Sequence, residues 1–230
     1  MTSRSYNQYC GLAYALDIVG ERWTLLIIRE LMAGPRRFTD LMDGLPGMST
    51  NLLAERLKSL EQRGLLCRRV LPPPAGSTVY ELTALGQTLE TTLLELGKWG
   101  SQFVPSSAEG ATLLKVGSYA LTLKTFFRPE QAQGVAETYE LHIDNEVLQV
   151  QINEGEIDVR QGETRPADVI FQTDMPTYLG LLQRQIQPDE AICGSFVRIE
   201  GDPAALSRFV DLCGLPGSPC IVLQKSFRRD

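Results

Sequence analysis

The chain has 230 residues, of which 43% are hydrophobic and 22% charged, with 20 glycines and 13 prolines. This length favours two domains, and the composition is that of globular proteins, which excludes fibrous and disordered chains. The formal net charge of −6 argues at first against nucleic acid as a partner, because phosphate backbones select cationic surfaces.

The charge is unevenly distributed along the chain. Residues 1–105 carry 11 basic and 10 acidic side chains, whereas residues 106–230 carry 11 basic and 18 acidic ones. Within the first part, residues 36–69 hold seven basic side chains against four acidic ones. This short segment is therefore the place where the sequence favours contact with a phosphate backbone.

Nothing in the sequence indicates export or membrane insertion. No segment reaches the roughly 18 uninterrupted apolar residues of a membrane span, and the polar N-terminus lacks the apolar run of a signal peptide. The five cysteines are odd in number and scattered, without a C-x-x-C pair. We therefore expect a cytoplasmic protein with reduced thiols and no membrane partner.

The first hundred residues are predicted to be mainly helical. Apolar side chains at helical spacing predict one helix over residues 12–19 and a second over residues 23–31, and both helices face a core. A short helix over residues 37–42 and a turn at residues 45–47 follow them.

The segment after this turn has the most informative pattern. Ser49 is placed to cap a helix over residues 50–62, and Gly64 is placed to end it. Leucines occupy one side of that helix, while the opposite side displays hydrogen-bonding side chains from Asn51 to Gln62. We expect this helix to bury the first side and to present the second to a partner.

Two β-type segments come next, over residues 65–71 and 78–82, and a turn with three prolines joins them. The elements thus follow the order of a winged helix-turn-helix, in which the helix after the turn enters the major groove and the hairpin flanks the duplex. The alternative is an ordinary small α+β domain in which the same elements form only a core.

A family resemblance extends over about residues 8–104. The residues that carry it are Cys10, residues 13–31, residues 34–41, Ser49, Leu53, Arg56, Leu57, Leu60, Glu61, residues 64–66, residues 80–83, Gly86 and Trp99. With them the first half resembles the HxlR family of bacterial winged-helix transcriptional regulators, which are related to the MarR group. The resemblance implies a homodimer, joined through the N-terminal helix and the helix after the wing. It also implies an inverted-repeat operator in double-stranded DNA and, in most cases, repression.

Candidate DNA-binding residues follow from this resemblance and from the charge pattern. Asn51 is suited to pair bidentately with adenine, and Lys58 to reach a guanine or a phosphate. The arginines are expected to contact phosphates, although each is alternatively a solvated surface charge. The full set is Arg36, Arg37, Ser49, Thr50, Asn51, Glu55, Arg56, Lys58, Arg68 and Arg69.

Cys10 has two interpretations. The resemblance implies a thiol sensor, because a cysteine at this place serves several HxlR-type regulators as a sensor of oxidants or electrophiles. That role requires an exposed thiolate of low pKa. No Lys, Arg or His adjoins Cys10 in the sequence, so simple packing is the alternative.

A second domain is predicted after a linker. An amphipathic helix over residues 87–103 is followed by a segment rich in serine and alanine, which places the linker at residues 106–111. We therefore assign residues 1–105 to the winged-helix DNA-binding and dimerisation domain, and residues 112–230 to a ligand-binding domain.

The second domain is predicted to be α+β, with an antiparallel sheet covered by helices. Strands are expected at residues 139–143, 147–152, 157–160, 168–173 and 196–201, of which the first three form a meander. Helices are expected at residues 175–184, 188–193 and 204–212.

This second half resembles the sterol carrier protein type 2 fold, most clearly over residues 167–209. The resemblance implies an apolar tunnel between the sheet and its helices, and with it an apolar small molecule or lipid as ligand. The candidate lining residues are Phe171, Tyr178, Leu181, Leu182, Ile186, Phe196 and Phe209. Each of them is alternatively a core residue.

The sequence predicts no catalytic residue, metal site or cofactor, because the single histidine, His142, has no partners for a triad or a metal site. We expect a DNA-binding regulator whose C-terminal domain binds an apolar effector that modulates the dimer. The alternatives are a lipid or small-molecule binding protein whose winged helix serves dimerisation or protein contacts, and a redox sensor acting through Cys10. In either regulator the acidic second domain is expected to face away from the DNA.

Overall fold

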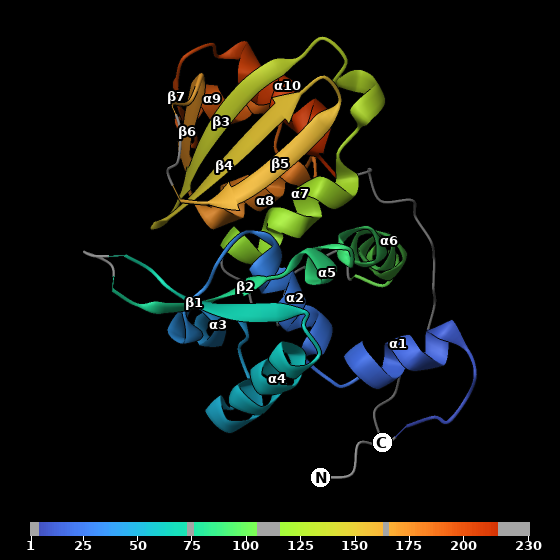
Figure 1. The fold of residues 1–230 in the computed structure, drawn as a ribbon. Helices are drawn as coiled ribbons and strands as arrows, with labels where there is room; N and C mark the ends of the chain where they lie inside the picture. The colour runs from blue at the N-terminus through green and yellow to red at the C-terminus, as the bar shows by residue number, and fades with distance from the viewer. Residues whose placement is uncertain (1–4, 73–75, 105–115, 163–165, 216–230) are drawn as a thin grey trace, which may run out of the picture.

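The computed structural model describes residues 5–72, 76–104, 116–162 and 166–215. It places them in two domains, one of helices with a two-stranded sheet and one built on a five-stranded sheet (Figure 1). The predicted linker, residues 106–111, lies outside the described residues. No described helix combines the length and the apolar character that crossing a membrane requires.

The N-terminal domain has the predicted elements in the predicted order. Its helices are α1 (Gly11–Val19), α2 (Thr24–Met32), α3 (Phe38–Gly44) and α4 (Thr50–Gln62), and its antiparallel hairpin consists of β1 (Leu66–Val70) and β2 (Thr78–Leu82). Ile27, Leu41 and Leu57 are among the fully buried residues of its core. The winged helix-turn-helix prediction is therefore confirmed for this half of the chain.

The helix predicted over residues 87–103 is α6 (Glu90–Ser101), and a short helix that was not predicted, α5 (Ala84–Gln87), precedes it. The Thr83 hydroxyl caps α5 by accepting a hydrogen bond from the Gly86 amide at 3.1 Å. A side chain at Gly86 would overlap the carbonyl oxygen of Leu65, so α5 packs directly on the chain that enters the wing. Residues 88 and 89 separate α5 from α6.

The C-terminal domain contains the five predicted strands. They are β3 (Ala136–Ile143), β4 (Glu146–Asn153), β5 (Glu156–Gln161), β6 (Val169–Thr173) and β7 (Arg198–Glu200), arranged in the order β5-β4-β3-β6-β7. The antiparallel meander of the first three is confirmed, but β6 pairs with β3 in parallel. The sheet is therefore mixed rather than antiparallel. After β5, at one edge of the sheet, the chain crosses to the other side of β3, where β6 runs in the same direction as β3.

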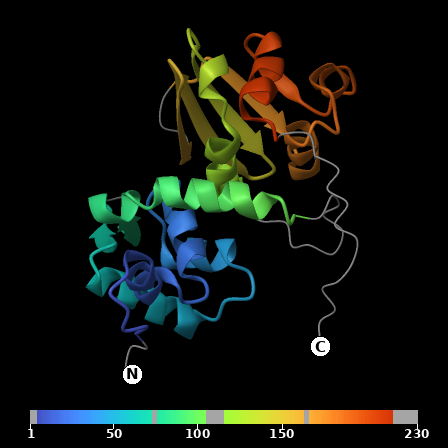
Figure 2. The ribbon, with the colours of Figure 1, turned by 90° about the vertical axis from the view of Figure 1, so that its right-hand side faces the viewer.

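Helices cover one face of this sheet, as Figure 2 shows from the side. They are α7 (Ala120–Phe126), α8 (Met175–Leu182), α9 (Pro188–Cys193) and α10 (Ala204–Cys213). In the second domain, no element was predicted before residue 139. The structure has α7 there, flanked by the 3₁₀ turns η1 (Val116–Tyr119) and η2 (Pro129–Gln131). With seven residues, α7 is too short to produce a readable helical period.

The two domains are in direct contact. α6 lies between them and packs against α7 (Figure 2). Leu121 of α7 is buried in the N-terminal core, and Ala33, which follows α2, is buried in the C-terminal core. Lys124 Nζ and the Glu90 carboxylate form an ion pair of 2.6 Å across the boundary. α4 lies on the side of the N-terminal domain that faces away from the C-terminal domain (Figure 1).

Candidate DNA-binding surface

α4 forms as the sequence predicts. Ser49 caps its first turn, because the Ser49 hydroxyl accepts a hydrogen bond from the Leu52 amide at 3.4 Å. Gly64, with φ of +73°, takes the left-handed conformation that ends the helix. The side that faces the core is formed by Leu53, Leu57 and Leu60.

The opposite side of α4 is exposed to solvent. Ser49, Thr50, Asn51, Glu55 and Lys58 are all exposed, and they begin at the N-terminal end, where backbone amides have no helical partner. Amides, hydroxyls, a carboxamide and an ammonium group are thus displayed together. Such a set can donate to phosphates and can read base edges in a major groove.

Arg56 does not belong to this exposed surface. Its side chain is 16% exposed and forms ion pairs of 3.1 Å with Glu21 and with Glu55. Glu21 lies between α1 and α2, so Arg56 ties α4 to the rest of the domain. The prediction that Arg56 contacts phosphate is therefore not supported, because the pairing occupies its guanidinium.

The wing arginines are paired as well, although they remain about half exposed. Arg68 donates from Nε and Nη2 to the two carboxylate oxygens of Glu61, both at 2.9 Å, and Arg69 pairs with Glu81 at 2.8 Å. The hydrogen bond from Arg68 lowers the pKa of Glu61, so this carboxylate stays charged at neutral pH. Each wing arginine thus brings little net charge to the surface.

Arg36 and Arg37 have different surroundings. Arg37 is exposed at the start of α3, as predicted. Arg36 instead lies at the domain boundary, where its Nε donates to the Glu30 carbonyl at 3.2 Å and burial lowers the pKa of its guanidinium. A phosphate contact through Arg36 is not available while the two domains are docked.

Some exposed cations of this domain have no carboxylate partner. Among the described residues, Arg37, Lys58 and Arg63 are exposed and have no carboxylate within ion-pair distance. Arg63 belongs to the basic segment, residues 36–69, but was not among the predicted DNA-binding residues. Its position directly after the last residue of α4 was the signal that could have identified it.

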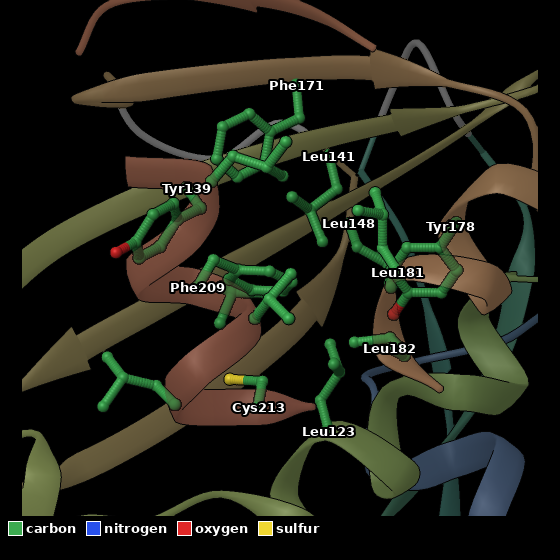
Figure 3. Packing of buried hydrophobic residues seen from close by; sticks show 14 of the residues in the cluster. Leu123, Tyr139, Leu141, Leu148, Phe171, Tyr178, Leu181, Leu182, Phe209 and Cys213 are labelled. Carbon is green, nitrogen blue, oxygen red and sulfur yellow. The ribbon is translucent and has the colours of Figure 1, made fainter. Parts of the chain in front are cut away.

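The C-terminal domain holds most of the predicted lining residues in its core (Figure 3). Phe171, Tyr178, Leu181, Leu182 and Phe209 are buried in one cluster, and Ile186 packs against it. Phe196 is 59% exposed, so its prediction as a lining residue is wrong. It lies on a bend after α9, while its neighbour Val197 is buried.

A cavity in this cluster is small. It measures about 20 Å³ and is lined by Leu141, Ile143, Phe171, Thr173, Tyr178, Val197, Leu206 and Phe209. This is space for about one water molecule rather than for a lipid. The Tyr178 hydroxyl is buried without a hydrogen-bond partner in the same core, and burial raises its pKa.

Cys10 is exposed and sits at the N-terminus of α1. Hydrogen bonds from the backbone amides of Ala13 and Leu12 lower the pKa of its thiol. Cys10 is therefore not packed in the core of its own protomer. No group of three or more His, Cys, Asp or Glu side chains is arranged to bind a metal in the part of the chain that the structure describes.

Apolar side chains are exposed on α1 and α6, which lie on the same side of the N-terminal domain (Figure 1). We call this set the α1–α6 surface. The Trp99 and Phe103 rings are in edge contact, with centroids 5.0 Å apart. The α1–α6 surface comprises Tyr9, Leu12, Tyr14, Leu16, Leu96, Trp99 and Phe103.

Comparisons with known proteins match the two domains separately. Residues 18–108 match the HxlR-like helix-turn-helix family, and residues 122–214 match the SCP-2 sterol transfer family. The chain is 42% identical over 89 residues to the HTH-type transcriptional regulator YodB of Bacillus subtilis (strain 168), covering 39% of this chain and 80% of YodB.

Two further similarities concern the same kind of protein. The uncharacterized HTH-type transcriptional regulator sll1512 of Synechocystis sp. is 35% identical over 105 residues, which are 46% of this chain and 78% of sll1512. The solved structure of reduced YodB from B. subtilis is 38% identical, covers 44% of this chain and 99% of that one, and has a TM-score of 0.38.

Proposed function

Because this chain belongs to the HxlR-like helix-turn-helix family of transcriptional regulators, we propose that it is a homodimeric repressor that binds an inverted-repeat operator. In this proposal α4 of each protomer enters a major groove, with Asn51 reading a base and Lys58 reaching a base or a phosphate. The protein has no catalytic activity of its own and acts in the cytoplasm.

The exposed side of α4 is the observation that carries the proposal. The donors at its N-terminal end are exposed, Lys58 lies further along the same exposed side, and the exposed Arg63 directly follows the helix at its C-terminal end. The acidic C-terminal domain lies on the far side of the N-terminal domain (Figure 1), so its negative charge is held away from a duplex bound at α4.

The α1–α6 surface supports the dimer. Large apolar side chains exposed together mark interaction surfaces, because burying them removes apolar area from water. α7 of the same chain already covers one side of α6. A second copy, docked through its own α1 and α6, would cover the remaining side and set the spacing of the two α4 helices.

Operator binding is tested by gel retardation with DNA from upstream of the protein's own gene, over a series of salt concentrations. Replacing Asn51→Ala together with Lys58→Met should weaken specific binding by about tenfold or more, since each base contact is worth roughly 1–3 kcal/mol. The slope of affinity against salt should also fall by about one for each Lys58 that contacts a phosphate.

A matched control for Lys58 is Arg198→Met, because Arg198 is a 75% exposed cation on β7 of the other domain. It should leave both affinity and salt slope unchanged. Absence of sequence-preferring retardation at low salt would refute the proposal. Full affinity of the double variant would mean that α4 is not the reading helix.

We further propose that the C-terminal domain binds an apolar effector after a change of its own shape. The SCP-2 match and the aromatic cluster around Phe171, Tyr178 and Phe209 support this assignment. Ligand sites usually measure about 300–1,000 Å³, far more than the cavity of about 20 Å³. An effector would therefore have to separate α8 or α10 from the sheet.

Native mass spectrometry of the freshly purified full chain tests this effector. A retained apolar mass, lost on mild organic extraction, is the expected result. The unmodified chain mass, together with an unchanged melting temperature in the presence of long-chain fatty acids and sterols, would contradict it.

Redox sensing through Cys10 is a second candidate function. The exposed thiol and its lowered pKa favour it, because the thiolate is the form that oxidants and electrophiles attack. Diamide treatment should change operator affinity in the native protein and leave the Cys10→Ser variant unaffected. Equal responses of both proteins would exclude Cys10 as the sensor.

A further inference from the structure

The wing is attached to Arg36 through an isolated antiparallel β-bridge with Tyr80. The Arg36 amide donates to the Tyr80 carbonyl at 2.9 Å, and the Tyr80 amide donates to the Arg36 carbonyl at 2.7 Å. Tyr80 lies in the middle of β2, opposite Arg68 of β1. The backbone position of Arg36 therefore sets where the wing leaves the domain.

The side chain of Arg36 points from this bridge into the domain boundary. Its Nε donates to the Glu30 carbonyl of α2 at 3.2 Å, and its guanidinium lies directly against Gly117 of η1. A Cβ atom at position 117 would overlap Arg36 Nη2 and would come within 2.8 Å of Gln161 Oε1. The glycine thus leaves just enough room for the guanidinium between the domains.

The edge of the C-terminal sheet completes the surroundings of Arg36. Gln161, the last residue of β5, donates from its amide to the Ala33 carbonyl at 3.2 Å and from Nε2 to Glu146 at 3.0 Å. Its Oε1 is buried without a hydrogen-bond partner. A small shift of this sheet edge toward Arg36 would give that oxygen a donor, so the boundary can change at low cost.

Arg36 and its neighbour Arg37 have separate tasks according to this geometry. Arg37 is exposed, whereas Arg36 is mostly enclosed by groups of both domains, and Glu30 and Glu146 supply negative charge near its guanidinium. A charge enclosed in this way is poorly placed to meet phosphate, but it is well placed to hold two domains and the wing in register.

We propose that Arg36 is a positioning residue that couples the C-terminal domain to the wing. The Arg36 guanidinium lies against Gly117 of the C-terminal domain, and the Arg36 backbone is bonded to β2 through Tyr80. A movement of the C-terminal sheet edge is thereby transmitted to the angle of the wing. The consequence for operator affinity rests on the proposed DNA binding, whereas the mechanical coupling does not.

Hydrogen–deuterium exchange of the full-length protein, without DNA, tests the coupling. Arg36→Met keeps the length of the side chain but removes the guanidinium, and Gly117→Ala displaces it from the other domain. Both should make the β2 amides around Tyr80 exchange about tenfold faster, as expected when one well-formed buried hydrogen bond is lost.

Arg37→Met is the matched control and should leave wing exchange unchanged. Two results would overturn the proposal: unchanged wing exchange in Gly117→Ala, or unchanged exchange in Arg36→Met with a salt slope of DNA binding reduced by about one. The second result would make Arg36 a phosphate contact. If the protein binds no DNA, the exchange rates still decide whether the coupling exists.

Discussion

At the residue scale, arginines that are close in the sequence have different surroundings. Arg37 is exposed, Arg36 is enclosed between domains, Arg56 is paired with Glu21, and Arg68 is paired with Glu61. Their residue type predicted one role for all of them. The differences arise because carboxylates and backbone carbonyls approach from segments that are distant in the sequence.

Cys10 provides a prediction at this scale. Because its pKa is lowered by the amides of Ala13 and Leu12, a larger fraction of its thiol should be ionised at neutral pH than in an unfolded chain. The rate of alkylation by iodoacetamide should therefore rise at a lower pH in the folded protein than in a peptide of residues 6–14. Cys10→Ser identifies the signal, and identical pH profiles would contradict the prediction.

At the scale of elements, the prediction succeeded where a helix or strand has its own local signals. α4 has a serine cap, a leucine side and a glycine stop, and its bounds agree with the prediction. α7 is short and was missed, and so was α5, which precedes the predicted helix that became α6. These two differences depend on packing against the neighbouring domain and against the wing.

The cap of α4 can be tested separately. Ser49→Ala should lower the free energy of unfolding of the N-terminal domain by about 0.5–1 kcal/mol, toward the weak end for caps because the bond is 3.4 Å long. Both tryptophans, Trp23 and Trp99, belong to this domain, so urea unfolding followed by tryptophan fluorescence reports on it. Thr92→Ala, at an exposed position within α6, should not destabilise the protein. An equal loss in both variants would assign the effect to something other than capping.

At the scale of the whole molecule, the two domains have separate tasks and opposite positions. The proposed DNA-binding surface on α4 lies at one end, the acidic domain lies at the other, and α6 lies between them (Figures 1 and 2). The net charge of −6 is therefore an average over two regions that do not share a surface. A duplex bound at α4 meets chiefly the nearly neutral domain and its local cations.

Dimerisation is the prediction at this scale. Trp99→Glu should convert the dimer to a monomer, because it places a charge in the apolar α1–α6 surface, and light scattering after gel filtration would measure the mass. Operator affinity should fall with it, since two linked half-site readers become independent. Phe196→Glu is the matched control, because Phe196 has the same exposure, 59% against 60%, but lies on the other domain. A dimer that survives Trp99→Glu would place the interface elsewhere.

The sequence by itself determined the two domains, the winged-helix order, the α+β character of the second half and the exposed stripe of α4. These features depend on periodicity, caps and turns, which involve residues a few positions apart. Tertiary structure alone decided that Arg36 is enclosed, that Arg56 is paired with Glu21, that β6 runs parallel to β3, and that the cavity near Phe209 is small. The physical reason is that ion pairing, strand direction and residual volume depend on how segments far apart in the sequence dock against one another.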